Sequence, residues 1–234
     1  MRAGMLLILL VPSLAMADDA PEVVVGQTGV LTAGFVCTPG VYNTELTAPW
    51  DVMQHSVYRD DANYVRTVLI TEDGQPFRSA EGLVIAADHS FEDAPDLDIV
   101  VIPSSEGSMG VDLENEVFIE WLKKRCEDAD WVITLCDGAF PLAETGLLKD
   151  RVATTFPGDR DAFAEKYPEV EVRYDARFVV DGKFITSTGG APSFEPAFWL
   201  MERLYGHDHV ARTAQGLVHD WDVGKVPHLV VLED

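Results

Sequence analysis

The amino-acid sequence predicts an α/β fold, a single-domain three-layer α/β/α sandwich around a mostly parallel sheet. Segments typical of buried strands alternate with segments whose apolar residues recur at helical spacing, which favours parallel strands joined by helices. Ile99–Ile102 is apolar throughout, as expected of a parallel strand covered by helices on both faces. With 234 residues, 47% of them hydrophobic, the chain is long enough for one α/β domain with a sizeable core.

The first half of the chain is predicted to hold four strands and two helices. Val30–Cys37 is an apolar strand that ends at Thr38–Gly40, where proline and glycine interrupt regular structure. Apolar residues at helical spacing predict a helix over Glu45–Tyr58. The remaining elements are strands over Val65–Thr71, Gly82–Ala86 and Ile99–Ile102, and a helix over Asp112–Cys126 with Val117, Trp121 and Leu122 on one face.

The second half begins with a strand over Trp131–Leu135, directly followed by a helix. A hairpin is predicted around Asp181-Gly182, a dipeptide that favours a tight two-residue turn. Its strands are Arg177–Val180 and Phe184–Ser187. The other elements are a strand over Val152–Thr155 and helices over Asp159–Lys166, Ser193–Tyr205, which places Phe198 and Trp199 in the core, and His209–Leu217.

A secretory signal peptide is predicted at residues 1–17. Arg2 gives a short positive start, Met5–Leu14 is an apolar run too short to span a bilayer, and Ala15–Ala17 is a small-x-small cleavage site. A periplasmic or secreted protein is therefore expected, with an uncleaved anchor as the alternative. The segments are then the signal peptide, a polar mature N-terminus over residues 18–28 and one domain over residues 29–234.

The chain is strongly acidic. It has 17 Lys and Arg against 40 Asp and Glu, a formal net charge of −23. Such a surface repels nucleic-acid phosphates and anionic membranes. We therefore expect no nucleic-acid partner and, after signal cleavage, no membrane partner.

Cys136 lies where the predicted strand Trp131–Leu135 gives way to a helix, with Gly138 two residues on. The first N–H groups of a helix carry partial positive charge, which favours a thiolate over a thiol, and the thiolate is the nucleophile. Hydrolases use the same strand–turn–helix joint as a nucleophile elbow. We interpret Cys136 as a reactive cysteine; a buried core residue is the alternative, because cysteine is often buried.

An odd number of cysteines, Cys37, Cys126 and Cys136, leaves at least one thiol free or paired between chains. Cys126 and Cys136 are separated by a whole strand, which is too long for a disulfide with its Cα limit of about 7 Å. Cys37 ends the first predicted strand. It could approach Cys136 only if their two strands are neighbours.

Five segments in fixed order resemble the ThiJ/PfpI family, also called the DJ-1/PfpI family, of the class I glutamine amidotransferase-like superfamily. The segments are Thr44–Val52, Asp98–Pro103, Leu135–Ala139, Leu142–Thr155 and Asp181–Ser187. The resemblance covers about residues 30 to 220. It implies a flavodoxin-like fold and a homodimer. We expect no cofactor and no metal.

The resemblance also implies site residues. The family's reactive cysteine falls on Cys136, and its acidic residue at a helix start, which hydrogen-bonds that cysteine, falls on Glu45. Backbone N–H groups that bind substrate or an oxyanion fall on Asp137, after the cysteine, and on Ser104 and Ser105, where the family has Gly-Gly. Gly138 belongs to the same turn and is included among these binding residues.

One position departs from the family pattern. Many members carry a histidine after the Thr-Thr pair, near the cysteine, and this chain has Phe156 there. Isocyanide hydratases of the family work with a cysteine and a carboxylate instead, and this chain is more similar to them. His207 and His209, with Asp208 and His219 nearby, could hold a metal weakly, but a solvated face is the expected role.

We predict a low pKa for the Cys136 thiol and a protonated Glu45, because a carboxyl buried against a thiolate has a raised pKa. The simpler role for Glu45 is a helix-start carboxylate that complements the helix dipole. Asp137 is either such a complement or a general base, and the sequence leaves both open. Tyr42 and Asn43 either line the pocket or belong to loop structure.

Two functions follow. The first is an exported lyase or hydratase in which Cys136 attacks a small electrophile, such as an aldehyde, ketoaldehyde or isocyanide carbon, while Glu45 or Asp137 moves a proton. The second is a non-catalytic protein that senses an oxidant through Cys136 or binds a ligand. A small-molecule substrate or oxidant is thus the expected partner, and a DNA-binding regulator is not expected of an acidic, exported chain.

Overall fold

The computed structural model describes residues 28–232. Within them, seven strands form a central sheet in the order β11-β9-β10-β6-β5-β1-β2. Neighbouring strands are parallel except β9 and β10, which form an antiparallel hairpin. The strands are β1 (Val30–Val36), β2 (Tyr64–Ile70), β5 (Ile99–Ile102), β6 (Trp131–Leu135), β9 (Phe178–Asp181), β10 (Phe184–Ser187) and β11 (His228–Val231).

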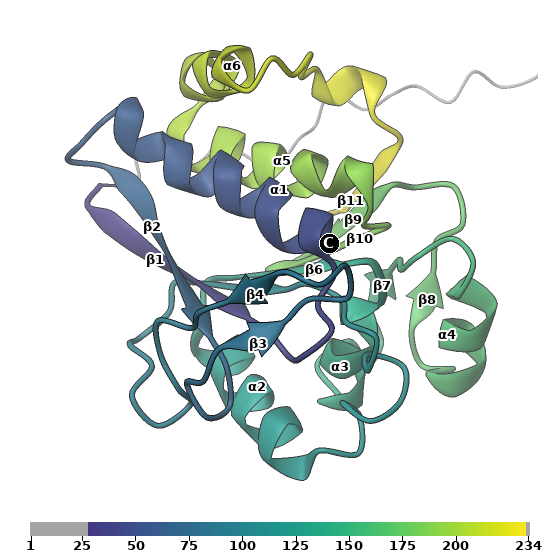
Figure 1. Ribbon diagram of the computed structural model, residues 1–234. Helices are drawn as coiled ribbons and strands as arrows, with labels where there is room; N and C mark the ends of the chain where they lie inside the picture. Colours follow the sequence, from purple (N-terminus) through teal and green to yellow (C-terminus); the bar gives the residue numbers. More distant parts are fainter. Residues whose placement is uncertain (1–27, 233–234) are drawn as a thin grey trace, which may run out of the picture.

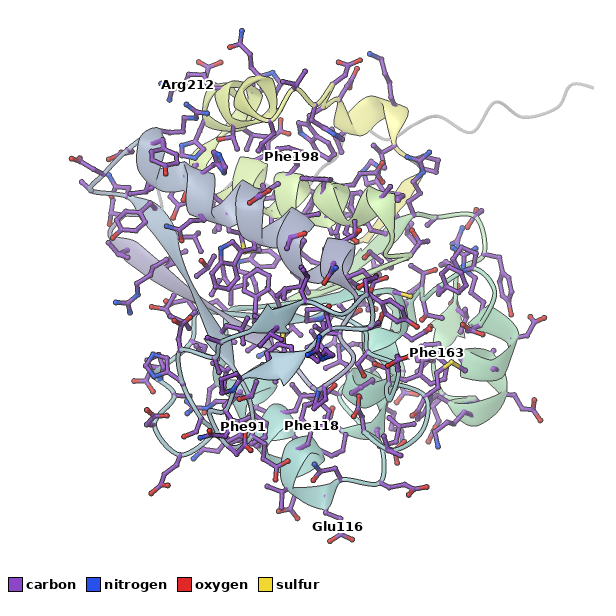
Figure 2. All side chains as sticks on the ribbon, viewed as in Figure 1. Phe91, Glu116, Phe118, Phe163, Phe198 and Arg212 are labelled. Atoms are coloured by element: carbon purple, nitrogen blue, oxygen red, sulfur yellow. The ribbon has the colours of Figure 1, made fainter. Side chains whose placement is uncertain are left out.

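Helices cover both faces of this sheet, so the expected three-layer architecture is confirmed (Figure 1). One layer holds α1 (Asn43–Gln54), α5 (Phe194–Tyr205) and α6 (His207–Gly216), and the other holds α2 (Glu116–Asp128), α3 (Ala139–Glu144) and α4 (Arg160–Lys166). Phe198 belongs to the first layer's core and Phe163 to the second, and Figure 2 shows them on opposite sides of the sheet.

The apolar run of β5 has a direct structural reason. Ile99 and Val101 pack into the core on the α1 and α5 side, whereas Val100 and Ile102 pack into the core on the α2 and α3 side. All four side chains are at most 1% exposed. A strand covered on both faces has no polar side, because successive side chains point to opposite faces.

The described residues also form two small sheets and several 3-10 helices outside the main sheet. Two two-stranded sheets pair β3 (Phe77–Arg78) with β4 (Val84–Ile85), and β7 (Val152–Ala153) with β8 (Glu171–Val172). The 3-10 helices are η1 (His55–Tyr58), η2 (Cys136–Gly138), η3 (Ala191–Ser193) and η4 (Val223–Lys225).

Several predicted boundaries differ from the structure. The helix expected over Glu45–Tyr58 is α1 followed by η1, and the strand expected over Gly82–Ala86 is the short β4, outside the main sheet. The helix expected from Asp112 begins at Glu116, because the side chain of Asn115 accepts the N–H of Phe118 (3.1 Å) and caps the helix there. Strands β3, β8 and β11 were not predicted, since each has only two or four residues and a weak pattern.

The hypothesis of a Cys37–Cys136 pair is wrong, because the two strands that carry these cysteines are not neighbours. Strand β5 lies between β1 and β6, so their backbones are about 10 Å apart, beyond the reach of a disulfide. Cys37, Cys126 and Cys136 are all free and buried.

The predicted signal peptide lies outside the described residues, so it stays a prediction. Within residues 28–232, no helix combines the length and apolar character needed to cross a membrane.

Candidate active site

Cys136 lies at the carboxyl end of β6, where the chain leaves the sheet. Its φ is +53°, in the left-handed region that a non-glycine residue seldom occupies. Strand β6 ends at Leu135, and the backbone turns through η2 into α3. Local strain at such a turn presents a side chain away from both elements.

Two glycines make this turn possible by allowing close backbone approach. A Cβ on Gly189, whose φ is +70°, would overlap the Cβ of Cys136, and a Cβ on Gly138 would overlap the carbonyl oxygen of Ile102. The loop after β10 therefore packs directly against the cysteine backbone, and η2 packs directly against the end of β5.

A cavity of about 290 Å³ opens beside the cysteine. The residues lining it are Tyr42, Glu45, Cys136, Asp137, Phe156 and Asp159. Among the described residues, the lining includes three carboxyl groups and neither a histidine nor a cationic side chain. Phe156 is 44% exposed, so the position where the family often has a histidine does face this cavity, but it offers no base.

Glu45 projects from the first turn of α1 and is 5% exposed. One carboxylate oxygen accepts the backbone N–H of Ser104 (3.2 Å) and the Ser104 hydroxyl, and the other accepts the N–H of Gly190 (3.3 Å). Burial raises the pKa of Glu45, while these hydrogen bonds and one from Cys136 lower it in part. Glu45 thus lies against the thiol, with a pKa shifted in the expected direction.

The Cys136 thiol has a raised pKa, opposite to the direction expected from the sequence. Burial is the largest cause, and the charges of Glu45 and Asp137 add to it, whereas hydrogen bonds from the Ser104 hydroxyl and the Asp137 N–H lower it only in part. Desolvation is the largest cause, and the two facing carboxylates act in the same direction, so this environment favours the thiol over the thiolate.

Asp137 is the carboxylate next to the thiol. Its carboxylate lies 3.7 Å from the Cys136 sulfur, which donates to it, and accepts the Thr155 hydroxyl at 3.0 Å. Burial raises the pKa of Asp137 to about 6, and the charge and hydrogen bond of Asp159 also raise it. Asp137 is ionised at neutral pH and can accept the thiol proton.

The predicted backbone donors at Ser104 and Ser105 are already occupied. The Ser104 N–H donates to Glu45, and the Ser105 N–H donates to the Ser108 hydroxyl (2.8 Å). Neither residue lines the cavity, and neither does Gly138. Serine hydroxyls in place of the family's glycines explain this, because they draw the loop into hydrogen bonds with Glu45 and Asp112.

Asp159 and Thr155 were not predicted as site residues. Asp159 immediately precedes α4, and its side chain reaches the cavity from there. Thr155 also donates to the carbonyl of Cys136 (3.0 Å), so it holds the turn and Asp137 together. The Thr154-Thr155 pair of the family pattern could have indicated Thr155. Asp159 is an acidic residue at a helix start, and no local pattern distinguishes it from others of that kind.

The pocket residues left open by the sequence are now placed. Tyr42 lines the cavity, whereas Asn43 does not and its backbone N–H donates to Glu81 (3.0 Å). The solvated role expected for the C-terminal histidines holds for His207, which is exposed and pairs with Glu202. It is wrong for His209, which is 6% exposed and stacks on Tyr205. In residues 28–232, no cluster of His, Cys, Asp or Glu is arranged to hold a metal.

A model of the DJ-1/PfpI family matches residues 32–203, most of the chain. The chain belongs to the DJ-1/PfpI family. Its fold is also that of the family, since the crystal structure of DJ-1beta from Drosophila melanogaster superimposes with a TM-score of 0.70 at 21% sequence identity, covering 82% of this chain and all of that one. The shared fold is the flavodoxin-like α/β architecture, a mostly parallel sheet covered by helices on both faces.

Two relatives of this chain are named for different functions, one as an enzyme and one as a transcriptional regulator. An isonitrile hydratase from Pseudomonas putida is 29% identical over 179 residues, which is 76% of this chain and 74% of the relative. A transcriptional regulator from Pseudomonas aeruginosa, CdhR, is 27% identical over 160 residues, which is 68% of this chain but 47% of the regulator. The chain therefore spans about half of the regulator's length.

Proposed function

We propose that this DJ-1/PfpI-family chain is a cysteine-dependent hydratase of small neutral electrophiles, with an isonitrile as the preferred substrate class. The observation that carries the proposal is the set of groups in one cavity: the Cys136 thiol, with the carboxyl groups of Glu45 and Asp137 against it. The similarity to an isonitrile hydratase supports it. A cysteine with one carboxyl group as proton acceptor and another as proton donor supplies the nucleophile and the acid–base groups that addition to an isonitrile carbon needs.

In the first step, one carboxyl group accepts a proton and the other donates one. Asp137 accepts the thiol proton as the sulfur attacks the terminal carbon of R–NC, and protonated Glu45 donates a proton to that carbon. The product is a thioimidate, Cys–S–CH=N–R. The pKa values fit these roles, because Asp137 is ionised near neutral pH and the pKa of Glu45 is raised by burial.

The second step releases the sulfur. Water adds to the thioimidate carbon, its proton passing to the now ionised Glu45 while protonated Asp137 donates to the nitrogen. When the adduct collapses, the C–S bond breaks, and Asp137 takes the proton of the adduct's hydroxyl and passes it to the leaving sulfur, which restores the thiol. The net reaction is R–NC plus H₂O giving the formamide R–NH–CHO, and both carboxyl groups end in the protonation states in which they began.

The cavity also selects by charge. Three carboxyl groups with no balancing cation among its described lining residues disfavour an anionic substrate. A neutral isonitrile meets no such penalty, and Phe156 offers an apolar surface for its organic group.

The test is turnover of cyclohexyl isocyanide, followed by the appearance of the formamide proton in NMR spectra, with methylglyoxal as the competing substrate. We expect formamide from the unaltered protein and none from Cys136→Ser. Lactate formed from methylglyoxal, without formamide, would show a glyoxalase instead. Absence of cysteine-dependent turnover with both substrates would refute the hydratase.

The second candidate is an oxidant sensor, in which Cys136 is oxidised by peroxide. The observation in its support is that the Glu45 carboxyl lies against the thiol and that burial raises its pKa; in its protonated form it would donate a hydrogen bond to a sulfinate. The raised pKa of the thiol argues against it, because peroxides react with thiolates.

Export to the periplasm or the medium and assembly into a homodimer are also part of the proposal.

A further inference from the structure

A second cavity, of about 340 Å³, lies at the carboxyl ends of β1 and β2 and shares no lining residue with the Cys136 cavity. Cys37 and Thr71 directly follow these strands, and α2 contributes its first turn. Carboxyl ends of parallel strands are where α/β proteins commonly bind ligands. The lining consists of Cys37, Thr38, Pro39, Thr71, Glu72, Asp73, Gln75, Pro76, Phe77, Phe91, Asp112, Asn115 and Phe118.

One wall of this cavity is aromatic. Phe77 is 8% exposed and Phe118 is 2% exposed, while the ring of Phe91 stacks 6.3 Å from that of Phe118. Figure 2 shows Phe91 and Phe118 close together on the α2 side of the molecule. The three rings give a small apolar or aromatic group a surface to bury against.

The other wall is acidic. Glu72, Asp73 and Asp112 line it, and among the described residues the lining contains no lysine, arginine or histidine. Asp112 is 9% exposed and accepts only neutral hydroxyls, from Thr38 (2.9 Å) and Ser105 (2.5 Å). Among the described residues this buried acid has hydrogen bonds but no ion pair, so a cation placed beside it would gain a favourable charge interaction.

A buried polar atom at this wall has no partner. The Thr71 hydroxyl belongs to a side chain that is 4% exposed, and it makes no hydrogen bond in the described structure. Buried hydroxyls are normally paired, so the unpaired hydroxyl of this cavity-lining residue has hydrogen-bonding capacity left for a ligand.

We propose that this second cavity binds a small organic cation, a primary ammonium group attached to an aromatic or short apolar body. The ammonium group donates to the Thr71 hydroxyl and supplies the positive charge that the three carboxyl groups lack, while its body lies on Phe77, Phe91 and Phe118. This site is independent of the proposed hydratase reaction.

The probe is phenethylamine, compared with phenylacetate and 2-phenylethanol, which have a similar size and ring but a negative or no charge. Binding is followed by NMR shifts of the Thr71, Gln75 and Asn115 amides. We expect saturable binding of the amine, at least about tenfold tighter than that of phenylacetate and weakened by added salt. Equal binding of the amine and the carboxylate, or no saturation up to about 10 mM, would overturn the proposal.

Variants locate the amine. Thr71→Val removes the unpaired hydroxyl with little change in volume, and Glu72→Gln and Asp73→Asn remove charge from exposed side chains while keeping an acceptor for their present hydrogen bonds. Each is expected to weaken phenethylamine binding about threefold. Asp159→Asn, in the Cys136 cavity, is the matched control and leaves it unchanged. Loss of binding in the control alone would place the amine in the Cys136 cavity and sink the proposal.

Discussion

At the scale of single residues, the proposed reactivity of Cys136 depends on which neighbouring group accepts the proton of its thiol. The Cys136 sulfur is buried between two carboxyl groups, which raises the pKa of its thiol, and in the proposed reaction Asp137 accepts the thiol proton. A cysteine at a helix start suggested the opposite, a standing thiolate. The sequence placed Cys136, Glu45 and Asp137 near one another, and all three line the cavity. It did not predict the direction of the thiol's pKa shift, because desolvation depends on how deeply the turn is enclosed.

The first prediction concerns pH. Because Asp137 must be ionised to accept the proton and its pKa is about 6, turnover should fall as the pH drops through about 6. Asp137→Asn should lower kcat/KM by a factor of about 100 or more and remove this acidic limb. The profile of kcat/KM against pH measures both effects. An unchanged acidic limb in Asp137→Asn would assign it to another group.

The second prediction isolates Asp159. Its charge and hydrogen bond raise the pKa of Asp137, so Asp159→Asn should move the acidic limb of the same profile to lower pH. Asp161→Asn is the control, since Asp161 lies in the first turn of α4, which begins directly after Asp159, but accepts the Tyr174 hydroxyl outside the cavity. If both variants moved the limb equally, the general acidity of the surface would be the cause.

At the scale of elements, the site depends on turns that bring backbones into contact. Gly189 touches the Cys136 backbone and Gly190 donates to Glu45, so the loop after β10 fastens both reactive residues. The hairpin that carries this loop was evident from Asp181-Gly182, and the three strands Ile99–Ile102, Trp131–Leu135 and Phe184–Ser187 have the predicted bounds. The contact with Gly189 was not evident, because it joins segments about fifty residues apart.

The third prediction tests that contact by stability. Gly189→Ala adds a methyl group that overlaps Cys136 and also strains a left-handed backbone, so it should lower the free energy of unfolding by about 2 to 4 kcal/mol. Gly146→Ala is the matched control: its φ is +83°, but nothing lies within 4 Å of the added Cβ. It should cost about 1 kcal/mol. Urea titration of both variants measures the two losses in unfolding free energy. Equal losses would mean that the backbone shifts enough to remove the overlap with Cys136.

At the scale of the whole molecule, alternation of strands and helices was enough to predict the layers, and five ordered segments were enough to indicate the family. The edge of the sheet was not predictable. Strand β11 has four half-buried residues without alternation, and only pairing with β9 defines it. Likewise, the serines at 104 and 105 gave no sign that their N–H groups are used within the protein.

The fourth prediction concerns processing. If residues 1–17 are a signal peptide, the protein recovered from the periplasm or medium should begin at Asp18, and its mass should be that of residues 18–234. Intact-mass spectrometry measures this, and light scattering on the same sample should give twice that mass for the expected homodimer. Full-length protein retained with the membrane fraction would support the uncleaved anchor.

The loop at Gly189 and Gly190 has a further consequence for how the chain is made. Cys136 leaves the ribosome some fifty residues before the glycines that enclose it, about 3 to 10 seconds at ordinary rates of synthesis. During that interval Glu45 has already been made, but the loop that packs against Cys136 and donates to Glu45 has not. The thiol of the nascent chain is therefore accessible to oxidants and to disulfides of other proteins, whereas in the folded protein it is 7% exposed. A chaperone that protects this cysteine would have to act in that interval.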